Sequence, residues 1–393
     1  MTAGVDSGRI IRALRGILPP GGGAAGLHEP RFCGNEWAYV KECLDTGWVS
    51  SLGKFVDRFE SDLAAYTGAK RAVAVVNGTA ALHICLKLAG VEPDDEVIIP
   101  ALTFVATANA VTYCGAVPHL ADSSERTLGL DPRRLEEHLK EITTVSGGPC
   151  MNKRTGRRIK AVVPMHTFGH PVDIEALMEL CGRFNLTLIE DAAESLGSFY
   201  KGAHTGTFGR LSALSFNGNK IITTGGGGAI LTNDEGLGRL AKHITTTARV
   251  AHRWAIAHDM AGYNYRMPNV NAAIGCAQLE RMTEFLADKR RLAERYRAAF
   301  EGMDGVRFFT EPAFARSNYW LNAILLDESF AHERDRLLEL TNAEGITTRP
   351  AWTLMQRLPM FKGCPGMDTP VAESIERRLI NIPSSAALGA DRA

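Results

Sequence analysis

The sequence predicts an α/β protein in which helices cover both faces of a mostly parallel β-sheet. Short segments typical of buried strands lie at residues 73–76 (V-A-V-V), 95–99 (D-E-V-I-I) and 186–189 (L-T-L-I). Segments of helical composition separate such runs, and the alternation continues through about residue 285. With 393 residues the chain is longer than one typical domain, so we expect a second, smaller region after the sheet.

We divide the chain into three parts. Residues 1–26 are an N-terminal extension, in which an amphipathic stretch over 10–18 precedes a proline pair and a glycine-alanine linker, and we expect it to be disordered. Residues 27–285 form the large domain in this interpretation, and residues 286–393 form a small α/β C-terminal domain.

In the second region, segments of helical composition and of strand composition also alternate. A helix rich in Ala, Glu, Arg and Leu over 271–299 is expected to bridge the two domains. After it we expect strands at 306–309, 319–326 and 346–349, with a helix over 331–343.

Bulk properties exclude several classes of function. The formal net charge is zero and no long basic run occurs, which argues against nucleic acid as a partner. The eight cysteines are dispersed without C-x-x-C pairs, as expected in a reducing cytoplasm, and no apolar run is long enough to span a bilayer. His166 and His170 are four residues apart, but Gly169 and Pro171 interrupt the helix that a zinc pair would need, so we expect no metal site.

A glycine turn follows the first predicted strand. Asn77, Gly78 and Thr79 end the strand, and helical composition begins at Ala80. Free backbone N–H groups and the helix dipole at such a turn favour phosphate, and Thr79 adds a hydroxyl group. An ordinary capped strand-to-helix turn would have the same sequence, so both interpretations stay open.

The turns after the next two predicted strands carry an aromatic ring and a carboxylate. Phe104 follows the strand at 95–99 and could lie flat on a planar ring, although core packing is the alternative. Asp191 follows the apolar run at 186–189, at the carboxyl end of the strand, where open α/β sheets place their ligands. The alternative for Asp191 is a helix N-cap with Glu194 three residues later, as in a capping box.

A lysine in a glycine-bounded turn is the fourth feature. Lys220 follows S-F-N-G-N at 215–219 and precedes four glycines at 225–228, after which a strand pattern resumes. A desolvated amine can form a Schiff base with an aldehyde. The separation of 29 residues between Asp191 and Lys220 is one strand-connection-strand unit, so both could reach one site.

These four features match the needs of pyridoxal phosphate (PLP). A lysine binds its aldehyde, a carboxylate pairs with the ring nitrogen, a glycine turn holds the phosphate and an aromatic side chain covers the ring. All four are predicted at strand ends, in the order in which a parallel sheet would present them.

Eight ordered motifs over residues 27–383 carry a resemblance to a known family. They are G-W-V-S-S-L-G-K (47–54), F-E-S-D-L-A-A-Y-T-G-A (59–69), N-G-T-A-A-L (77–82), D-E-V-I-I-P-A-L-T-F-V-A-T-A-N-A (95–110), H-T-F-G-H-P-V-D (166–173), E-D-A-A-E-S-L-G (190–197), S-F-N-G-N-K (215–220) and G-Y-N-Y-R-M (262–267). With them the chain resembles the DegT/StrS family of PLP-dependent nucleotide-sugar aminotransferases. The resemblance implies an aspartate-aminotransferase-like fold (PLP fold type I) with a seven-stranded sheet in the large domain.

The resemblance also implies roles for the candidate residues. Lys220 would hold the cofactor as a Schiff base and act as the acid and base of the proton shift. Asp191 would bind the pyridine nitrogen, Glu194 would lie near the ring hydroxyl and Phe104 would stack on the ring.

For the phosphate, the resemblance implies Gly78, Thr79 and Ser215, with Asn264 reaching in from the partner subunit of a homodimer that shares its active sites. Two positions depart from the commonest family pattern, which has His where Asn217 stands and Gln where Glu194 stands. These departures concern the sugar contacts and the ring-hydroxyl hydrogen bond, and they leave the covalent chemistry intact.

The implied function is transfer of an amino group from L-glutamate to C4 of a nucleotide-linked 4-keto-6-deoxy sugar in the cytoplasm. The motifs L-H-E-P-R-F (27–32) and S-F-N-G-N-K-I-I-T-T-G (215–225) are similar to those of the branch that acts on UDP-linked N-acetyl sugars of the legionaminic and bacillosamine type. UDP-2-acetamido-2,6-dideoxy-4-keto-hexose is therefore the expected acceptor. The alternative acceptor is GDP-4-keto-6-deoxymannose, which would give a perosamine-type product.

The residues argue against three other interpretations. A PLP-dependent sugar dehydratase of the same fold typically has histidine at the position of Lys220. A catalytically silent relative would not need both Lys220 and Asp191. A phosphate loop at residues 225–228 lacks the G-K-[ST] ending, since the lysine precedes the glycines.

Overall fold

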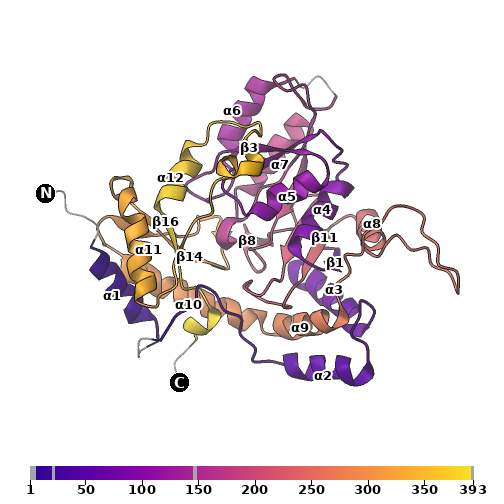
Figure 1. The fold of residues 1–393 in the computed structure, drawn as a ribbon, viewed down its shortest axis with the longest axis horizontal. Helices are drawn as coiled ribbons and strands as arrows, with labels where there is room; N and C mark the ends of the chain where they lie inside the picture. Colours follow the sequence, from indigo (N-terminus) through magenta and orange to yellow (C-terminus); the bar gives the residue numbers. More distant parts are fainter. Residues whose placement is uncertain (1–5, 20–22, 145–147, 391–393) are drawn as a thin grey trace.

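The computed structural model describes residues 6–19, 23–144 and 148–390. The largest sheet among these residues has seven strands in the order β1-β11-β10-β7-β6-β2-β3 (Figure 1). They are β1 (Arg71–Val75), β2 (Glu96–Pro100), β3 (Val117–Ala121), β6 (Ile159–Val162), β7 (Thr187–Asp191), β10 (Leu211–Ser215) and β11 (Gly228–Thr232). Only β11 runs antiparallel to its neighbours, so the predicted mostly parallel, seven-stranded sheet is confirmed.

Helices cover both faces of this sheet because successive strand residues point to opposite sides. In β1, Val73 and Val75 pack in one core cluster, whereas Ala72 and Ala74 pack in another. The first cluster includes side chains of α4 (Gly78–Leu88), α5 (Val105–Tyr113) and α8 (Glu235–Thr245). The opposite face carries α3 (Lys54–Thr67), α6 (Pro132–Ile142), α7 (Ile174–Phe184) and α9 (Asn269–Glu280).

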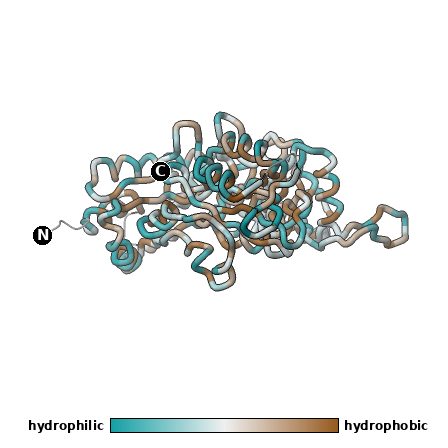
Figure 2. The backbone as a smooth tube through the Cα atoms, turned by 90° about the horizontal axis from the view of Figure 1, so that it is seen from above, coloured by the Kyte–Doolittle hydropathy of each residue, from teal (hydrophilic) through white to brown (hydrophobic). Residues whose placement is uncertain are grey.

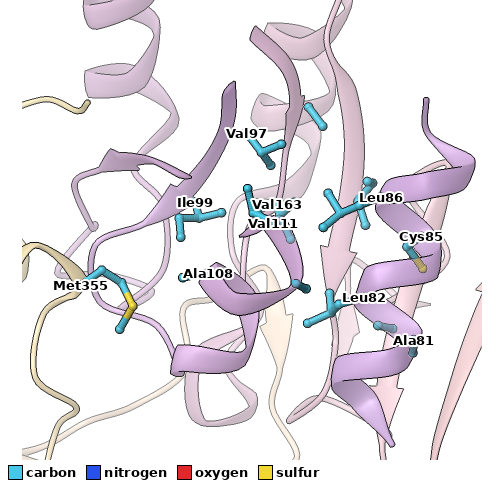
Figure 3. Packing of buried hydrophobic residues seen from close by; sticks show 14 of the residues in the cluster. Ala81, Leu82, Cys85, Leu86, Val97, Ile99, Ala108, Val111, Val163 and Met355 are labelled. Carbon is cyan, nitrogen blue, oxygen red and sulfur yellow. The ribbon is translucent and has the colours of Figure 1, made fainter. Parts of the chain in front are cut away.

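The first of these clusters also receives a residue from the C-terminal part of the chain. Figure 3 shows Met355 beside Ile99 of β2 and Ala108 of α5, with Val97 and Val111 farther along the same layer. The Met355 N–H group donates to the Ala101 carbonyl at 3.0 Å. The segment that contains Met355 is therefore fixed to the turn after β2.

A second, antiparallel sheet has the order β12-β14-β16-β15, and its strands are β12 (Val306–Phe308), β14 (Asn322–Leu326), β15 (Arg349–Pro350) and β16 (Leu379–Ile382). The helices of this region are α10 (Met282–Phe300), α11 (Arg334–Ala343) and α12 (Pro370–Arg378). A further helix is α2 (Glu36–Thr46), and shorter elements are β4 (Thr143–Thr144), β5 (Met151–Asn152), β8 (Phe199–Tyr200), β9 (Ala203–His204) and β13 (Ala315–Arg316), with 3₁₀ turns η1 (Thr167–Gly169), η2 (Glu328–Glu333), η3 (Met355–Arg357), η4 (Pro359–Phe361) and η5 (Ala386–Leu388).

The strand predicted at 319–326 begins three residues later in the structure. Tyr319 has a φ angle of 47°, in the left-handed region that a strand does not contain. The Asn318 side chain stabilises this bend, since its Oδ1 accepts the Trp320 N–H at 2.7 Å. Only the part from Asn322 onward pairs in the sheet.

The prediction that the N-terminal extension is disordered is wrong for residues 7–17. These residues form helix α1 (Ser7–Ile17), capped by the Asp6 carboxylate, which accepts the Arg9 N–H at 2.9 Å. Ile10 and Leu14 are fully buried in a cluster with Leu292 and Tyr296 of α10. The predicted amphipathic pattern is confirmed. The helix that covers its apolar face, α10, lies almost 300 residues away, so the local sequence gives no sign of it.

Truncating the apolar face of α1 should destabilise the protein. We expect Leu14→Ala to lower the free energy of unfolding by about 2–5 kcal/mol, because a fully buried leucine leaves a cavity. The control is Arg12→Ala on the exposed face of the same helix. The only described ion pair of Arg12 is with Asp6, and both side chains are exposed, so this substitution should lower the free energy of unfolding by less than about 1 kcal/mol. Urea unfolding of both variants tests this, and equal stability of the two would contradict the packing of α1.

Helix α10 packs at one end against the core of the large sheet and at the other end against the core of the second sheet. Met282 and Phe285, at its start, pack with α3 and α9, whereas Leu292 and Tyr296 pack with the second sheet and α1. Figure 1 shows α10 running between the region of α9 and the region of α1 and α11. No helix in the described part of the chain is long and apolar enough to cross a membrane.

Candidate active site

Six strand ends meet at one edge of the large sheet. Strands β1, β2, β3, β6, β7 and β10 point the same way, and β11 begins at the edge where they end. This edge carries Gly78 after β1, Phe104 after β2, Asp191 at the end of β7 and Ser215 at the end of β10. Ligands bind at this edge in open α/β sheets.

Lys220 reaches a buried carboxylate from the turn between β10 and β11. Its Nζ lies 3.1 Å from Oε1 of Glu194, whose side chain is 1 % exposed, and 3.8 Å from the centroid of the Trp320 ring. The Trp320 Nε1–H donates to the Asn219 carbonyl at 2.7 Å, next to Lys220 in the chain. Trp320 therefore contacts both the lysine side chain and its backbone turn.

The Glu194 carboxylate is held on both oxygens. Oε2 accepts the backbone N–H of Phe168 at 2.8 Å, while Oε1 faces Lys220. Phe168 adopts a φ angle of 56°, which a phenylalanine rarely does, and this conformation accompanies the hydrogen bond. Burial raises the pKa of Glu194 to about 7, against the opposing effect of the Lys220 charge.

Asp191 is buried at the carboxyl end of β7. Its Oδ2 accepts the Thr107 hydroxyl at 2.7 Å and its Oδ1 accepts the Ala193 N–H at 3.2 Å. Burial raises the pKa of Asp191, and these two hydrogen bonds and the Lys220 charge act in the opposite direction. Residues 192–198 form turns and no helix, so the capping-box interpretation of Asp191 and Glu194 is wrong.

Gly78 and Ser215 are in direct contact. A Cβ atom at Gly78 would lie 2.9 Å from the Ser215 Cβ, so glycine is required for this approach. Gly78 and Thr79 form the first turn of α4, whose N-cap Asn77 accepts the Ala80 N–H at 2.8 Å. The turn is thus an ordinary capped strand-to-helix turn, with Asn77 as the N-cap. It also places a helix N-terminus beside the Ser215 hydroxyl.

Phe104 and Asn264 are both exposed. Phe104, the N-cap residue of α5, is 48 % exposed, unlike the apolar residues before it at 101–102. The Asn264 amide oxygen accepts hydrogen bonds from Arg266 at 2.9 and 3.0 Å, and in the described chain it has no hydrogen bond to another predicted site residue. Its segment pairs with Thr246 at the base of an exposed hairpin, the arm that projects in Figures 1 and 2.

The two histidines of the 166–173 motif have separate surroundings. His166 Nε2 lies 3.0 Å from Glu190, and its Nδ1 accepts the Val172 N–H at 3.2 Å. His170 packs edge-on against the rings of Phe309 and Tyr319, and burial lowers its pKa to about 3. Across the described ranges, no three His, Cys, Asp or Glu side chains are grouped as a metal site would require.

The residues at this edge fit PLP. Lys220 offers an amine that is only 13 % exposed, and Asp191 offers a buried carboxylate with unused acceptor positions. The N-terminus of α4 at Gly78 lies beside Ser215, and a helix N-terminus favours a phosphate; the half-exposed Phe104 can cover a planar ring.

Sequence reasoning missed three residues of this edge: Thr107, Phe168 and Trp320. Thr107 lies one turn beyond Phe104, so its hydroxyl was a findable signal. Phe168 acts through its backbone N–H group and Trp320 lies 100 residues beyond Lys220 in the chain, so neither gives a local signal.

Comparisons with known proteins give the same class. Residues 32–393 match the model of the DegT/DnrJ/EryC1/StrS aminotransferase family. The GDP-perosamine synthase of Caulobacter vibrioides is 40 % identical over 364 residues, which cover 91 % of this chain and 92 % of that protein. A protein of the same description from Escherichia coli O157:H7 is 38 % identical over 360 residues, with 91 % and 92 % covered. The crystal structure of the aminotransferase TlmJ from Streptoalloteichus hindustanus superposes with a TM-score of 0.83 at 28 % identity, covering 93 % of this chain and 94 % of that one.

The fold is that of a PLP-dependent aminotransferase of fold type I. The chain belongs to the DegT/DnrJ/EryC1/StrS aminotransferase family.

The raised pKa of Glu194 gives a pH-dependent stability. Its folded value of about 7 lies above the ordinary 4.5, so the folded protein holds this proton more tightly and loses stability as pH rises between these values. Glu194→Gln removes that loss. In cofactor-free protein we expect Glu194→Gln to match the wild type near pH 4.5 and to be more stable by about 3 kcal/mol at pH 8. Urea unfolding at several pH values measures the difference, and a constant difference would contradict the assignment.

Proposed function

We propose that this protein transfers the amino group of L-glutamate to C4 of a nucleotide-linked 4-keto-6-deoxy sugar. The observation that carries the proposal is the contact between Lys220 and the buried Glu194 at the sheet edge that also holds Asp191. An amine beside two carboxylates of different surroundings suits a reaction in which protons move at a carbon atom.

In this proposal each residue at the edge has one role toward the cofactor. Lys220 binds it covalently, Asp191 pairs with the ring nitrogen and Phe104 covers the ring. Gly78, Thr79 and Ser215 bind the phosphate, which the N-terminus of α4 favours. Bound PLP supplies an aldehyde that exchanges amines and a ring that accepts electrons from the carbon losing its proton.

The chain's own contribution to the chemistry is the placement of protons. Lys220 must hold an unprotonated amine in order to take the α-proton of glutamate, and it returns a proton in the sugar half-reaction. Glu194 lies 3.1 Å from the Lys220 Nζ and has a pKa of about 7, so it can take up or release a proton beside the amine near neutral pH. Trp320 covers the same amine with an aromatic face and keeps water from that side.

The acceptor has two candidates. The sequence motifs at residues 27–32 and 215–225 support UDP-2-acetamido-2,6-dideoxy-4-keto-hexose as the acceptor. The names of the relatives from Caulobacter vibrioides and Escherichia coli support GDP-4-keto-6-deoxymannose, at 40 % and 38 % identity. Glutamate is proposed as the donor because the family uses it.

We further propose that the enzyme works in the cytoplasm as a homodimer with shared active sites. The described surface carries large exposed apolar side chains on two segments: Trp37, Trp48 and Leu52 around α2, and Trp254 and Ile256 on the hairpin after α8. Such side chains on a projecting hairpin suit contact with a second copy. Asn264, at the base of this hairpin, would contribute to the partner's phosphate site.

The test is an assay of the purified protein with glutamate and a panel of UDP- and GDP-linked 4-keto-6-deoxy sugars. Mass spectrometry detects the amino product, and 2-oxoglutarate is measured in parallel. Amination of one class of nucleotide sugar identifies the acceptor. A dehydrated sugar without an amine, or no product from any member of the panel, would refute the proposal.

A further inference from the structure

Three aromatic side chains from distant parts of the chain meet at the edge of the sheet that carries Lys220. Phe104 follows β2, Phe168 follows β6 and Trp352 follows β15. The ring centroids of Phe168 and Trp352 are 4.8 Å apart, and those of Phe104 and Trp352 are 6.1 Å apart. We call Phe104, Phe168 and Trp352 the aromatic cluster.

The aromatic cluster is connected to the lysine through short contacts. The Phe168 N–H donates to Glu194 at 2.8 Å, and the other oxygen of Glu194 lies 3.1 Å from the Lys220 Nζ. Trp352 packs on the Phe168 ring. Trp352 is therefore separated from the amine by only two residues in contact.

The geometry leaves Phe104 free to cover a planar ring. Trp352 meets Phe104 edge-on, with 61° between the ring planes, and Phe104 stays 48 % exposed. A cofactor stacked on Phe104 would thus have the indole of Trp352 beside it. The half-buried Trp352 would then face whatever reacts with the cofactor.

The backbone that carries Trp352 is fixed on both sides. Ala351 is buried, the Leu354 N–H donates to the Glu376 carboxylate at 3.0 Å, and the Met355 N–H donates to the Ala101 carbonyl at 3.0 Å. Met355 is inserted into the core beside Ile99 and Ala108 (Figure 3). The indole is therefore held in place before any ligand binds, which suits a residue that selects between ligands.

The chemistry of the aromatic cluster distinguishes the two substrates of an aminotransferase. Glutamate carries two carboxylates and gains little from a neutral aromatic surface. A 6-deoxy sugar carries a methyl group at C5 in place of a hydroxymethyl group, and this methyl can be buried on an indole face without leaving a hydroxyl unpaired.

We propose that Trp352 determines specificity for the acceptor by packing against the C5–C6 edge of a 6-deoxyhexose. This inference rests on the proposed function, because it assigns a contact to the same acceptor. Trp352 acts in substrate binding and takes no part in proton transfer.

The first test measures binding without turnover. Isothermal titration of the holoenzyme uses UDP- and GDP-linked 6-deoxyhexoses that lack the keto group, together with their 6-hydroxy counterparts. The wild type should bind the preferred 6-deoxy compound about tenfold more tightly than its 6-hydroxy counterpart, the discrimination typical of one apolar group. In Trp352→Ala the ratio should fall below twofold, and Trp352→Phe should keep an intermediate ratio.

The second test separates the two half-reactions. Trp352→Ala should react with glutamate within about twofold of the wild-type rate, followed by the cofactor's absorbance, while KM for the keto sugar rises about tenfold or more. The control is Met360→Ala, an exposed residue of the same C-terminal segment, which should match the wild type in both measurements.

The outcomes distinguish this inference from the proposed function. Wild-type binding of the 6-deoxy compounds with an unchanged ratio in Trp352→Ala would overturn the role of Trp352 alone. Equal losses in both half-reactions would make Trp352 a structural residue and also overturn it. If the wild-type protein binds 6-deoxy compounds but never aminates a keto sugar, the proposed reaction is refuted, and the binding ratios alone decide the role of Trp352. If the protein binds no nucleotide sugar at all, both the proposed reaction and the role of Trp352 are refuted.

Discussion

Replacing Lys220 with alanine is expected to abolish amine transfer while the protein remains folded. The variant loses the only described amine next to Glu194, and with it both the covalent link to the cofactor and the group that moves the proton. Loss of general acid–base catalysis alone corresponds to about 10²–10⁴-fold, and loss of the link adds to this. Product formation measured by mass spectrometry should therefore fall by about 10³-fold or more.

Two further measurements make this prediction specific. Borohydride reduction of the wild-type holoenzyme followed by peptide mapping should label Lys220, and the variant should show no label. Circular dichroism and urea unfolding should show that the variant keeps its fold, because the Lys220 side chain is partly exposed and replaces no core residue. A label on another lysine, or full activity in Lys220→Ala, would overturn the assignment.

Replacing Asp191 with asparagine should weaken cofactor binding and slow turnover by about 10²–10³-fold. The substitution keeps the size of the side chain and an oxygen that can accept from Thr107 or Ala193, but it removes the negative charge that would hold a protonated ring nitrogen. Equilibrium dialysis against PLP and steady-state kinetics measure the two effects.

A graded variant accompanies this prediction. Thr107→Val removes the hydroxyl that donates to Asp191 Oδ2 at 2.7 Å and leaves the carboxylate in place. Because that hydrogen bond counteracts the pKa rise of Asp191, the variant should lose activity by less than Asp191→Asn, and the loss should grow as pH falls. Wild-type rates in Asp191→Asn would mean that another group serves the ring nitrogen.

The features that sequence reasoning found are those with local patterns. Gly78, Phe104, Asp191 and Ser215 each follow a short apolar run, and parallel strands bring such positions to one edge whatever the rest of the fold. The short apolar run in β1 likewise predicts a strand covered on both faces, and its residues pack in two core clusters on opposite sides.

The features that it missed depend on contacts between distant segments. Trp320 and Trp352 belong to the second region, and only the folded chain brings them to the edge of the first sheet. The capping-box alternative for Asp191 could not be excluded because a turn and a helix start share the same residue types. The acceptor sugar gives no local sequence signal either, because acceptors differ by single groups that a few side chains select.

The pairing of α1 with α10 has a consequence for the order in which the protein can assemble during translation. The strands of the large sheet are complete when Thr232 has left the ribosome, so that sheet can collapse early. The smaller core needs α1 (Ser7–Ile17) together with α10 and β16 (Leu379–Ile382). Helix α1 is therefore made well before the segments that cover it, and its apolar face stays exposed until α10 has been synthesised.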